Sequence, residues 1–550
     1  MNDLLLPAAE VHVPYARPSG QRSTTTLATY TGTWGIRQVT HLLKRTMFGA
    51  SKSDIDYFLT RTMTQAVDEL LTAGTPPSPP VNNYNEQYTD TVVAPGATWV
   101  TDFSNQPMSL GVRQQSLKAW WFGLMVNQNR SIEEKLVLFW HNHFATQLSA
   151  YQFPIAGYLY LNTIRQNAFG DFKQFVKAIT LDPAMLRFLN GDQNSAAAPD
   201  ENYGRELQEL FTVGKDLANH YTESDVQMAA RVLSGYRINT NYTSYFDSTA
   251  HDTTNKQFSS FYNNTVITGQ SGAAGANELD DLLTMIFNQQ EVAKYICRKL
   301  YRFFVYYDID ATVETNIIEP LATIFRNSNY NIKTALDTLF KSEHFFDVLN
   351  YGCVIKSPVD FLAGLCREYK VAMPVSSDIP LNYRTWLTTD YFSITLGQDL
   401  LDPPSVSGWT EYYQLPQFHE LWINSSTLPL RNQITDALLY TGFSVSAGGN
   451  TFKLQIDAIV YASQFATPDD PIALIDDILN QLYMLDVSQT VKDYLRQYGL
   501  LGGQTQNYYW TNAWNDYIAN PSDMVKRNVV ETRLRYVLKY LMNSSEYQLS

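Results

Sequence analysis

The stretch from Lys135 to Phe144 is apolar around almost the whole circumference of a predicted helix. Such a helix is stable in water only when other elements bury it on all sides, so it is expected at the centre of the core. Apolar residues also recur at helical spacing in many other segments, for example from Leu117 to Met125, whereas strand-like alternation is rare. The sequence therefore predicts a mainly α fold: a large multi-helix body with long irregular loops and at most a small β-hairpin.

Changes in composition divide the chain into three parts. Residues 1–33 are rich in Pro, Ser and Thr and lack periodicity, which predicts an extended N-terminal arm. Residues 34–427 form the predicted helical core, interrupted by a polar loop at 237–278 that favours a short β-hairpin. Residues 428–550 return to helical pattern with a break near Gly448–Asn450, and they are predicted to pack on the core as a C-terminal helical part.

Charge and hydropathy exclude several classes of protein. The net charge of -14 argues against a nucleic-acid or anionic-membrane partner, because both require a surface rich in Lys and Arg. No stretch long enough to cross a bilayer is free of charged and strongly polar residues, so no membrane span is expected. Residues Met1–Pro7 lack the basic region and the apolar core of a signal peptide.

The most distinctive polar stretch is Pro199–Phe211, which combines acids, an arginine and an asparagine with apolar residues on one predicted helix. At about 100° per residue its polar side chains form two adjoining faces: Asn202, Glu206 and Glu209 on one, and Glu201 and Arg205 on the other. Carboxylates so arranged can bind a cation or move protons, with the arginine orienting them. The alternative is a surface ion network in which Arg205 pairs with Glu201 and Glu209, each four residues away.

Two histidines, His141 and His143, lie in the apolar helix. They point roughly 200° apart on a continuous helix and cannot bind one ion together unless that helix breaks. One interpretation is a pair of buried histidines, each hydrogen-bonded to a carboxylate or a carbonyl. The other is that one of them joins the acidic helix as a metal ligand or base.

Other candidate residues lie in irregular segments. His251 and Asp252, with Lys256 four residues later, belong to the polar loop, where a histidine is either a surface turn residue or part of a site that folds over the acidic helix. Asn194 ends a run of amides and carbonyls that offers oxygen ligands to Ca²⁺ or Mg²⁺. Trp409 follows a Pro-Pro turn and either stacks on a ligand or anchors its loop.

Several motifs occur in an order that resembles the bacterial domain-of-unknown-function 1800 family, over roughly residues 36–549. They are Phe139-Trp-His-Asn-His-Phe144, Asp182-Pro-Ala-Met185, Asn190 to Asn194, Pro199-Asp-Glu-Asn202, Arg205-Glu-Leu-Gln-Glu-Leu-Phe-Thr212, Tyr221-Thr-Glu-Ser-Asp225, His251-Asp252, Lys356-Ser-Pro358, Pro403-Pro-Ser-Val-Ser-Gly-Trp409 and Ser545-Glu-Tyr-Gln-Leu549. The resemblance implies a large, mostly helical protein, periplasmic or extracellular, often encoded beside a protein that resembles the alkaline-phosphatase superfamily. It implies no agreed reaction.

The leading hypothesis is a metal-assisted hydrolase that acts on an extracellular or periplasmic polymer or its fragments and uses a divalent metal ion. It assigns catalysis to Glu206, Arg205, His251 and Asp252, metal binding to His141, His143, Glu206 and Glu209, and substrate binding to Asn194, Glu201, Asn202, Lys256 and Trp409. The alternative is a non-catalytic exported protein that binds or assembles with the phosphatase-like partner, its polar residues forming a buried network. A carboxylate–histidine iron oxidoreductase is disfavoured, because the paired Glu-x-x-His pattern is absent.

Overall fold

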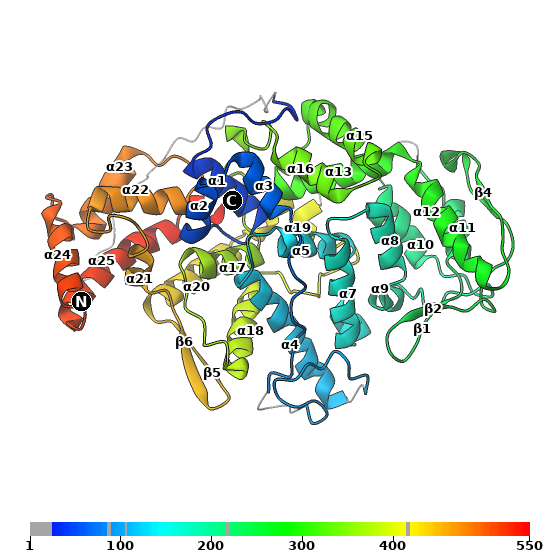
Figure 1. Cartoon of the computed structure of the whole chain (residues 1–550), viewed down its shortest axis with the longest axis horizontal. Helices are drawn as coiled ribbons and strands as arrows, with labels where there is room; N and C mark the ends of the chain where they lie inside the picture. Colours follow the sequence, from blue (N-terminus) through cyan, green and yellow to red (C-terminus); the bar gives the residue numbers. More distant parts are fainter. Residues whose placement is uncertain (1–24, 85–89, 105–106, 216–219, 414–417) are drawn as a thin grey trace.

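The computed structural model describes residues 25–84, 90–104, 107–215, 220–413 and 418–550. Helices build nearly all of it, which confirms the predicted mainly α fold (Figure 1). The first helices gather in the middle of the molecule: α1 (Ile36–Thr46), α2 (Lys52–Leu59), α3 (Met63–Leu70), α4 (Pro107–Val126), α5 (Glu133–His143), α6 (Leu148–Tyr151) and α7 (Pro154–Asn167).

The next segments lie to the right in Figure 1 and carry the acidic stretch: α8 (Phe172–Thr180), α9 (Pro183–Phe188), α10 (Asn202–Glu206), the π-helix η1 (Leu207–Thr212), α11 (Glu223–Val232) and α12 (Glu278–Phe287). The chain then returns to the middle through α13 (Gln290–Phe304), α14 (Ala311–Val313), η4 (Glu314–Ile318), α15 (Glu319–Asn327), α16 (Ile332–Phe340), α17 (Pro358–Glu368), α18 (Ile379–Thr395) and α19 (Thr410–Tyr413).

The last helices extend to the left: α20 (Thr427–Tyr440), α21 (Ala458–Ala462), α22 (Pro471–Leu482), α23 (Gln489–Tyr494), η7 (Leu495–Leu500), α24 (Tyr508–Ala519) and α25 (Met524–Met542). Short 3₁₀ turns complete the helical elements: η2 (Ser260–Tyr262), η3 (Gly272–Asn277), η5 (Val348–Asn350), η6 (Phe418–Trp422) and η8 (Glu546–Gln548). No helix in the described ranges has the length and apolar character needed to cross a bilayer.

The strands seen in these ranges form two-stranded antiparallel sheets. Two pairs lie in the polar loop, β1 (Tyr236–Ile238) with β2 (Ser244–Phe246) and β3 (Lys256–Gln257) with β4 (Val266–Ile267). The third pair, β5 (Phe443–Ala447) with β6 (Asn450–Leu454), occupies the predicted helix break. Gly448 and Gly449, with φ of 61° and 79°, form its two-residue turn, because a tight hairpin requires positive φ at both positions.

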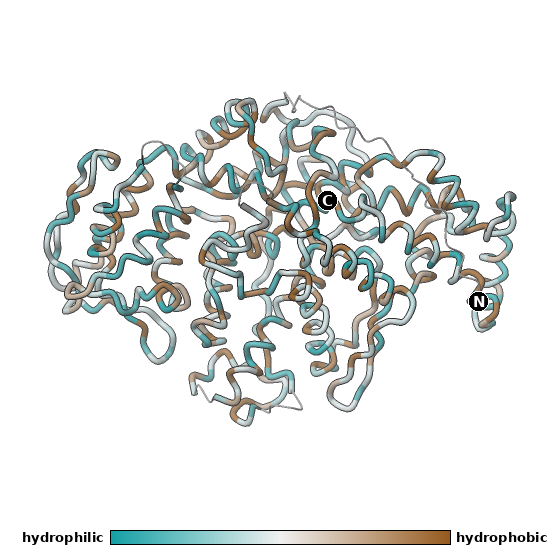
Figure 2. The backbone as a smooth tube through the Cα atoms, turned by 180° about the vertical axis from the view of Figure 1, so that it is seen from behind, coloured by the Kyte–Doolittle hydropathy of each residue, from teal (hydrophilic) through white to brown (hydrophobic). Residues whose placement is uncertain are grey.

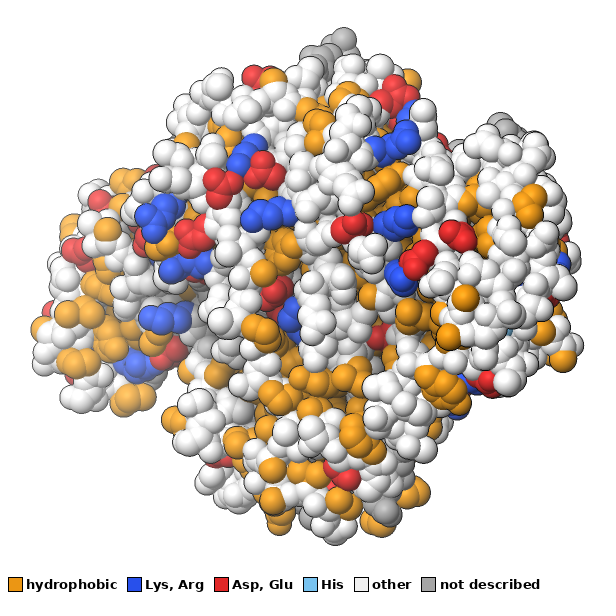
Figure 3. Space-filling model, turned by 45° about the vertical axis from the view of Figure 1, so that its right-hand side comes forward, with side chains coloured by type: hydrophobic (Ala, Val, Ile, Leu, Met, Phe, Trp, Pro, Cys, Tyr) orange, Lys and Arg blue, Asp and Glu red, His pale blue; other side chains and the backbone are white. Residues whose placement is uncertain are grey.

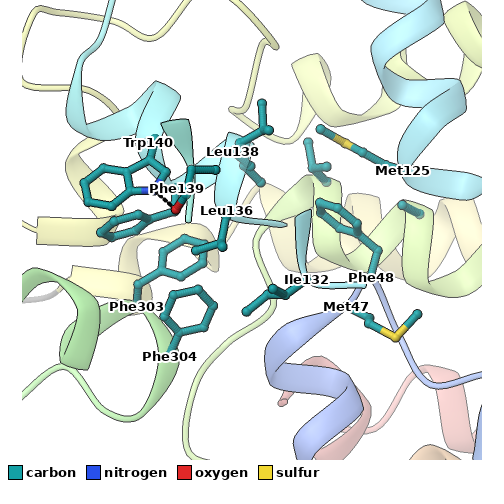
Figure 4. Close-up of a cluster of buried hydrophobic side chains, with 14 of the residues drawn as sticks. Met47, Phe48, Met125, Ile132, Leu136, Leu138, Phe139, Trp140, Phe303 and Phe304 are labelled. Atoms are coloured by element: carbon teal, nitrogen blue, oxygen red, sulfur yellow. Dashed lines mark hydrogen bonds between the residues drawn. The ribbon is translucent and has the colours of Figure 1, made fainter. Parts of the chain in front are cut away.

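The helix α5 lies at the centre of the core, as its sequence predicts, and every residue from Glu134 to His143 is buried. Figure 4 shows its apolar side chains between phenylalanines of α13 and residues that follow α1. Figure 2 shows that hydrophobic and hydrophilic residues alternate along the helices throughout the body. One apolar cluster runs from Val39 to Tyr547, so residues on both sides of the predicted boundary at 427 share a core.

Both ends of the described chain are tied to the middle of the molecule. Residues 1–24 of the predicted N-terminal arm lie outside the described residues, and within residues 25–33 the backbone of Tyr30 donates to the carbonyl of Lys341 at 2.8 Å. The C-terminus lies close to α1 in Figure 1, where Ile355 and Leu549 form a β-bridge. On the face in Figure 3, acidic and basic side chains lie next to one another with apolar groups between them.

Candidate functional site

The acidic stretch is not one regular helix. An α-helical turn, α10, ends at Glu206, and the π-helix η1 continues from Leu207 to Thr212. A π-helix closes its hydrogen bonds over five residues, so the spacing of 100° per residue does not hold between Glu206 and Glu209. The predicted common face of these carboxylates is therefore corrected. Short π-helical segments are frequent at functional sites, because the extra residue in the turn redirects side chains.

Gln208 holds the α-to-π junction in place. Its side-chain amide donates to the carbonyl of Gly204 at 2.9 Å, and its side-chain oxygen accepts from the hydroxyl of Tyr262 at 2.8 Å. Its backbone carbonyl accepts from the amides of Val213 and Gly214, at 2.9 and 3.0 Å. Because Gln208 is fully buried, these contacts fix the backbone on which the neighbouring carboxylates stand.

The carbonyls at the end of η1 bond to buried side chains of the core. His143 donates from Nε2 to the carbonyl of Phe211 at 3.1 Å, while Tyr295 donates to the carbonyl of Leu210 at 3.0 Å. Lys299 donates to the same Leu210 carbonyl at 3.2 Å and to Nδ1 of His143 at 3.1 Å. Both ring nitrogens of His143 are thus occupied, which fits the buried-histidine interpretation. Burial and the nearby Lys299 hold the pKa of His143 well below its usual value.

His141 has different surroundings. Its Nδ1 lies 3.3 Å from the hydroxyl of Tyr160, which in turn donates to the carbonyl of Phe144 at 2.6 Å. The rings of Trp121 and Trp409 lie 5.4 and 5.6 Å from the imidazole. Burial lowers the pKa of His141 to about 3, so the ring is neutral. The two histidines therefore point into separate environments, and only His143 contacts η1.

Glu206 is the unusual member of the acidic stretch. Its side chain is half-buried, and it forms no hydrogen bond or ion pair with any residue in the described ranges. Burial and, second, the negative charge of Glu209 raise the pKa of Glu206 to about 7. A carboxyl group with a pKa near 7 is poised for proton transfer at neutral pH.

Two groups lie close to Glu206: the carboxylate of Glu209 and the phenol of Tyr221. Glu209 forms an ion pair with Lys215 at 3.1 Å. Tyr221 is almost fully buried, and burial followed by the charge of Glu209 raises the pKa of its phenol above the usual value. The phenol is therefore a protonated hydrogen-bond donor beside the two carboxyl groups.

Arg205 belongs to a surface ion network. Its guanidinium contacts Glu223 at 2.9 Å and Glu201 at 3.2 Å. Glu223 comes from the first turn of α11 and takes the place that the sequence assigned to Glu209. Asn202 is exposed, and its backbone amide donates to Asp200 at 2.9 Å. These residues border the carboxyl pair, and the ion pairs of Arg205 are with Glu201 and Glu223.

The polar loop residues form a separate buried network around Glu278. The carboxylate of Glu278 is 3.1 Å from Nε2 of His251 and 2.5 Å from Nζ of Lys256, and all three side chains are almost completely buried. Asp252 pairs with Arg231 at 2.7 Å, and although burial raises the pKa of Asp252, hydrogen bonds from Arg231 lower it below its usual range overall. This network fastens the polar loop to α11 and α12.

Asn194 and Trp409 also serve as anchors. The buried amide of Asn194 donates to the carbonyl of Ala230 at 2.8 Å and accepts from the backbone of Asp200 at 3.0 Å. Trp409 is buried, and its backbone amide donates to Asn142 at 2.7 Å. Among the candidate residues, the fold brings Glu201, Asn202, Arg205, Glu206 and Glu209 together. No hydrogen bond or ion pair between described residues connects them with His251, Asp252 or Lys256.

The sequence analysis assigned no role to three residues of these networks. Tyr221 and Glu223 belong to the motif Tyr221–Asp225, and they reach the acidic stretch only because α10 packs against α11. Glu278 lies 22 residues after Lys256 in a segment without any signal of function. Within the described ranges, no three or more His, Cys, Asp or Glu side chains gather closely enough to hold a metal ion.

Comparison with known proteins gives one assignment. A search among curated proteins and another among solved structures found no match. The family model described as "Protein of unknown function (DUF1800)" matches residues 41–549, which is nearly the whole chain. The match includes the acidic stretch, the two histidines of α5 and the network around Glu278. The chain therefore belongs to the DUF1800 family.

Proposed function

We propose that the protein is a hydrolase in which Glu206 is the general acid. The observation that carries the proposal is the state of this side chain: a half-buried carboxyl group with a pKa of about 7 and no hydrogen-bond partner in the described ranges. Structural carboxylates are normally paired, so an unpaired one at the start of a π-helix favours a role in chemistry.

The groups beside Glu206 account for both protons that the hydrolysis moves. Glu206 donates its proton to the leaving oxygen of an ester or glycosidic bond as that bond breaks. Glu209, which pairs with Lys215, accepts the proton that the attacking water releases. Tyr221 supplies a hydrogen-bond donor to the oxygen that gains negative charge. Exchange of protons with solvent then restores both carboxyl groups.

The proposed substrate is an extracellular or periplasmic polymer or its fragments. Asn202 is exposed beside the carboxyl pair, as a group that contacts a bulky substrate needs to be. A divalent metal ion stays a separate prediction: in that case Glu206 and Glu209 would both be ionised and their oxygens would hold Ca²⁺ or Mg²⁺ in place of the proton on Glu206.

The test compares Glu206→Gln with Glu319→Gln, the same change at a surface carboxylate outside the site, on panels of alkyl esters and alkyl glycosides, whose leaving oxygens need a proton. Glu206→Gln is expected to lower kcat by about 10² to 10⁴, whereas Glu319→Gln leaves it nearly unchanged. Wild-type activity should fall as the pH rises through about 7, because the acid loses its proton. Equal activity of both variants would refute the role of Glu206.

A second candidate is a non-catalytic exported protein that binds or assembles with a phosphatase-like partner. The observation that favours it is the network of His251, Lys256 and Glu278, in which the candidate catalytic groups are sealed in the interior. A wild-type chain that cleaves no substrate of either panel, yet binds such a partner, would support this function over hydrolysis.

A further inference from the structure

A second candidate surface lies on the last helices of the chain, at the left end of the molecule in Figure 1 and opposite the end that carries the acidic stretch. Six tyrosines gather there on α23, η7, α24 and α25. They are Tyr494, Tyr498, Tyr508, Tyr509, Tyr536 and Tyr540. We call this group the tyrosine surface.

Four of these rings form one cluster. The ring centres of Tyr494 and Tyr498 are 4.9 Å apart, and those of Tyr494 and Tyr540 are 5.6 Å apart. The hydroxyls of Tyr494 and Tyr536 lie 2.9 Å from each other. Tyr494 is therefore the centre of a row of rings that joins α23 and η7 to α25.

The other two rings form a pair beside the same helix. The ring centres of Tyr508 and Tyr509 are 4.5 Å apart. Arg533, which precedes Tyr536 by one turn of α25, donates to the carbonyl of Tyr509 at 2.8 Å and to that of Leu500 at 3.2 Å. The pair and the cluster therefore border neighbouring turns of α25.

The tyrosine surface faces solvent. Tyr498 and Tyr508 are 51 % and 52 % exposed, and Tyr509 is 37 % exposed. Single exposed apolar groups are common on protein surfaces and need no explanation. Several aromatic rings that gather on one exposed face are instead typical of a binding surface.

The residues that follow the pair fix its backbone to the body of the protein. Trp510 is completely buried, and its indole donates to the carbonyl of Pro468 at 2.8 Å. The hydroxyl of Thr511 donates to the carbonyl of Asp469 at 2.8 Å. A ligand that stacks on Tyr508 therefore does not have to order this part of the chain first, which favours its affinity.

The chemistry of the surrounding residues indicates the kind of ligand. Residues 497–515 contain no Asp, Glu, Lys or Arg. Apart from the tyrosines, the exposed side chains of this range are amides and one hydroxyl: Gln504, Thr505, Gln506, Asn512 and Asn515. No aliphatic side chain within 497–515 is exposed, which disfavours the apolar centre of a protein–protein interface. Amides and phenols donate and accept hydrogen bonds without carrying charge.

Basic side chains next to the tyrosines in the sequence already have partners. Arg533 donates to the two backbone carbonyls described above. Arg496 pairs with Asp493 at 3.4 Å. Lys539 pairs with Asp436 at 2.6 Å. A nucleic acid or another polyanion requires cations that are available beside the stacking rings, so the tyrosine surface favours an uncharged ligand.

We propose that the tyrosine surface binds a neutral glycan chain. The C–H groups on one face of a sugar ring pack on the face of an aromatic ring, and the sugar hydroxyls exchange hydrogen bonds with phenols and side-chain amides. Tyr498 and Tyr508 offer half-exposed rings, and Gln504 and Gln506 lie in the loop between them. This surface does not include Glu206, and glycan binding does not depend on the proposed hydrolysis.

The test is affinity electrophoresis of the full chain in native gels that contain laminarin, mixed-linkage β-glucan, galactomannan or dextran, with the polyanion alginate as the comparison. At least one neutral polysaccharide is expected to retard the wild type. The variants Tyr498→Ala and Tyr508→Ala each remove an exposed ring, and the matched control Tyr391→Ala removes a ring that is 61 % exposed on α18, outside this surface. Each surface variant is expected to raise the dissociation constant about tenfold, and the control to leave it unchanged. The Tm of each variant checks that it is folded.

Two further variants separate the possible causes of a loss. Tyr508→Phe keeps the ring and should bind within about threefold of the wild type. Glu206→Gln should bind like the wild type, so the result is independent of the hydrolysis test. The proposal is overturned if no neutral polysaccharide retards the wild type, if alginate alone retards it, or if Tyr391→Ala weakens binding as much as Tyr508→Ala. A wild-type dimer that Tyr498→Ala converts to a monomer, without retardation by any glycan, would assign the surface to a second copy of the chain and overturn the proposal as well.

Discussion

Lys299 donates a hydrogen bond to Nδ1 of His143 at 3.1 Å, in the interior of the protein. The contact joins α13 to α5, and through Phe211 and Leu210 both residues hold the carbonyls of the π-helix η1. Burial lowers the pKa of Lys299 to about 7. The backbone beneath the acidic site therefore depends on two core side chains that belong to distant parts of the sequence.

Replacement of His143 by Phe should destabilise the protein. The change leaves the carbonyl of Phe211 and one donor of Lys299 without their partner, at a cost of about 1–3 kcal/mol each. Urea unfolding followed by circular dichroism measures the effect. The control is His220→Phe at an exposed position, which should change the free energy of unfolding by less than about 0.5 kcal/mol.

The pKa of Glu206 predicts how stability changes with pH. Its folded-state pKa of about 7 lies above the ordinary value of 4.5, so the folded chain binds this proton more tightly. The contribution is complete below about pH 4.5 and is lost as the pH rises to about 7. Glu206→Gln, which stays neutral, should be more stable than the wild type at pH 8, and this advantage should disappear near pH 4.5.

Parallel urea titrations of the two proteins between pH 4.5 and 8 isolate this contribution, because other titrating groups cancel in the difference. A difference in unfolding free energy that does not change with pH would contradict the raised pKa of Glu206.

Loss of the charge on Glu278 should be severe. Glu278→Gln leaves Lys256 buried without a counter-ion, and breaking a buried pair in this way costs about 3–5 kcal/mol. The matched control is Glu319→Gln, which breaks a surface ion pair with Lys294 and should cost no more than about 1 kcal/mol. Thermal unfolding compares the stability of the two variants. Similar losses of stability would show that the network around Glu278 is not structural.

Two glycines without close neighbours should respond in opposite directions to replacement by alanine. Gly449→Ala places a side chain at φ of 79° in the β5–β6 turn and should destabilise by about 1 kcal/mol from backbone strain alone. Gly111→Ala, inside α4, should stabilise by about 0.4–1 kcal/mol, because alanine restricts the unfolded chain and favours the helix. Chemical denaturation measures the free energy of unfolding of the two variants, and equal changes in this free energy would argue against the hairpin turn.

The metal prediction is tested by elemental analysis of the purified protein. If Glu206 and Glu209 bind a divalent ion, the wild type should carry about one ion per chain and Glu206→Gln should lose it. Glu201→Gln, at the residue that precedes α10, should retain it. Ion-free wild type after dialysis against Ca²⁺, Mg²⁺ or Zn²⁺ and removal of the excess would count against a metal at this site.

Local signals in the sequence predict much of the fold. The all-round apolar pattern of Lys135–Phe144 correctly gives a central helix, and the side chains of Asp182 and Thr222, residues that commonly cap helices, cap α9 and α11. These features depend on a few residues that are neighbours along the chain, so they can be recognised in the sequence alone. The π-helix escapes prediction because it depends on Gln208, Tyr262 and His143, which meet only in the folded chain.

The candidate site is predicted in part for the same reason. Glu201, Asn202, Arg205, Glu206 and Glu209 are neighbours along the chain, so their proximity is assured. The partner of Arg205 is Glu223 in place of Glu209, because the packing of α10 against α11 brings a second carboxylate closer. His251 is not a surface turn residue, because its imidazole contacts the carboxylate of Glu278 in the interior of the protein.

The bridge between residues 354–356 and 548–550 also sets an order of events during synthesis. Arg45, which donates to the carbonyl of Asn350, leaves the ribosome early, but the neighbouring residues 354–356 cannot form this bridge until about 500 further residues have been made. Until then residues 354–356 lack the backbone partners that hold them, so this part of the core is completed only after residues 548–550 have been made.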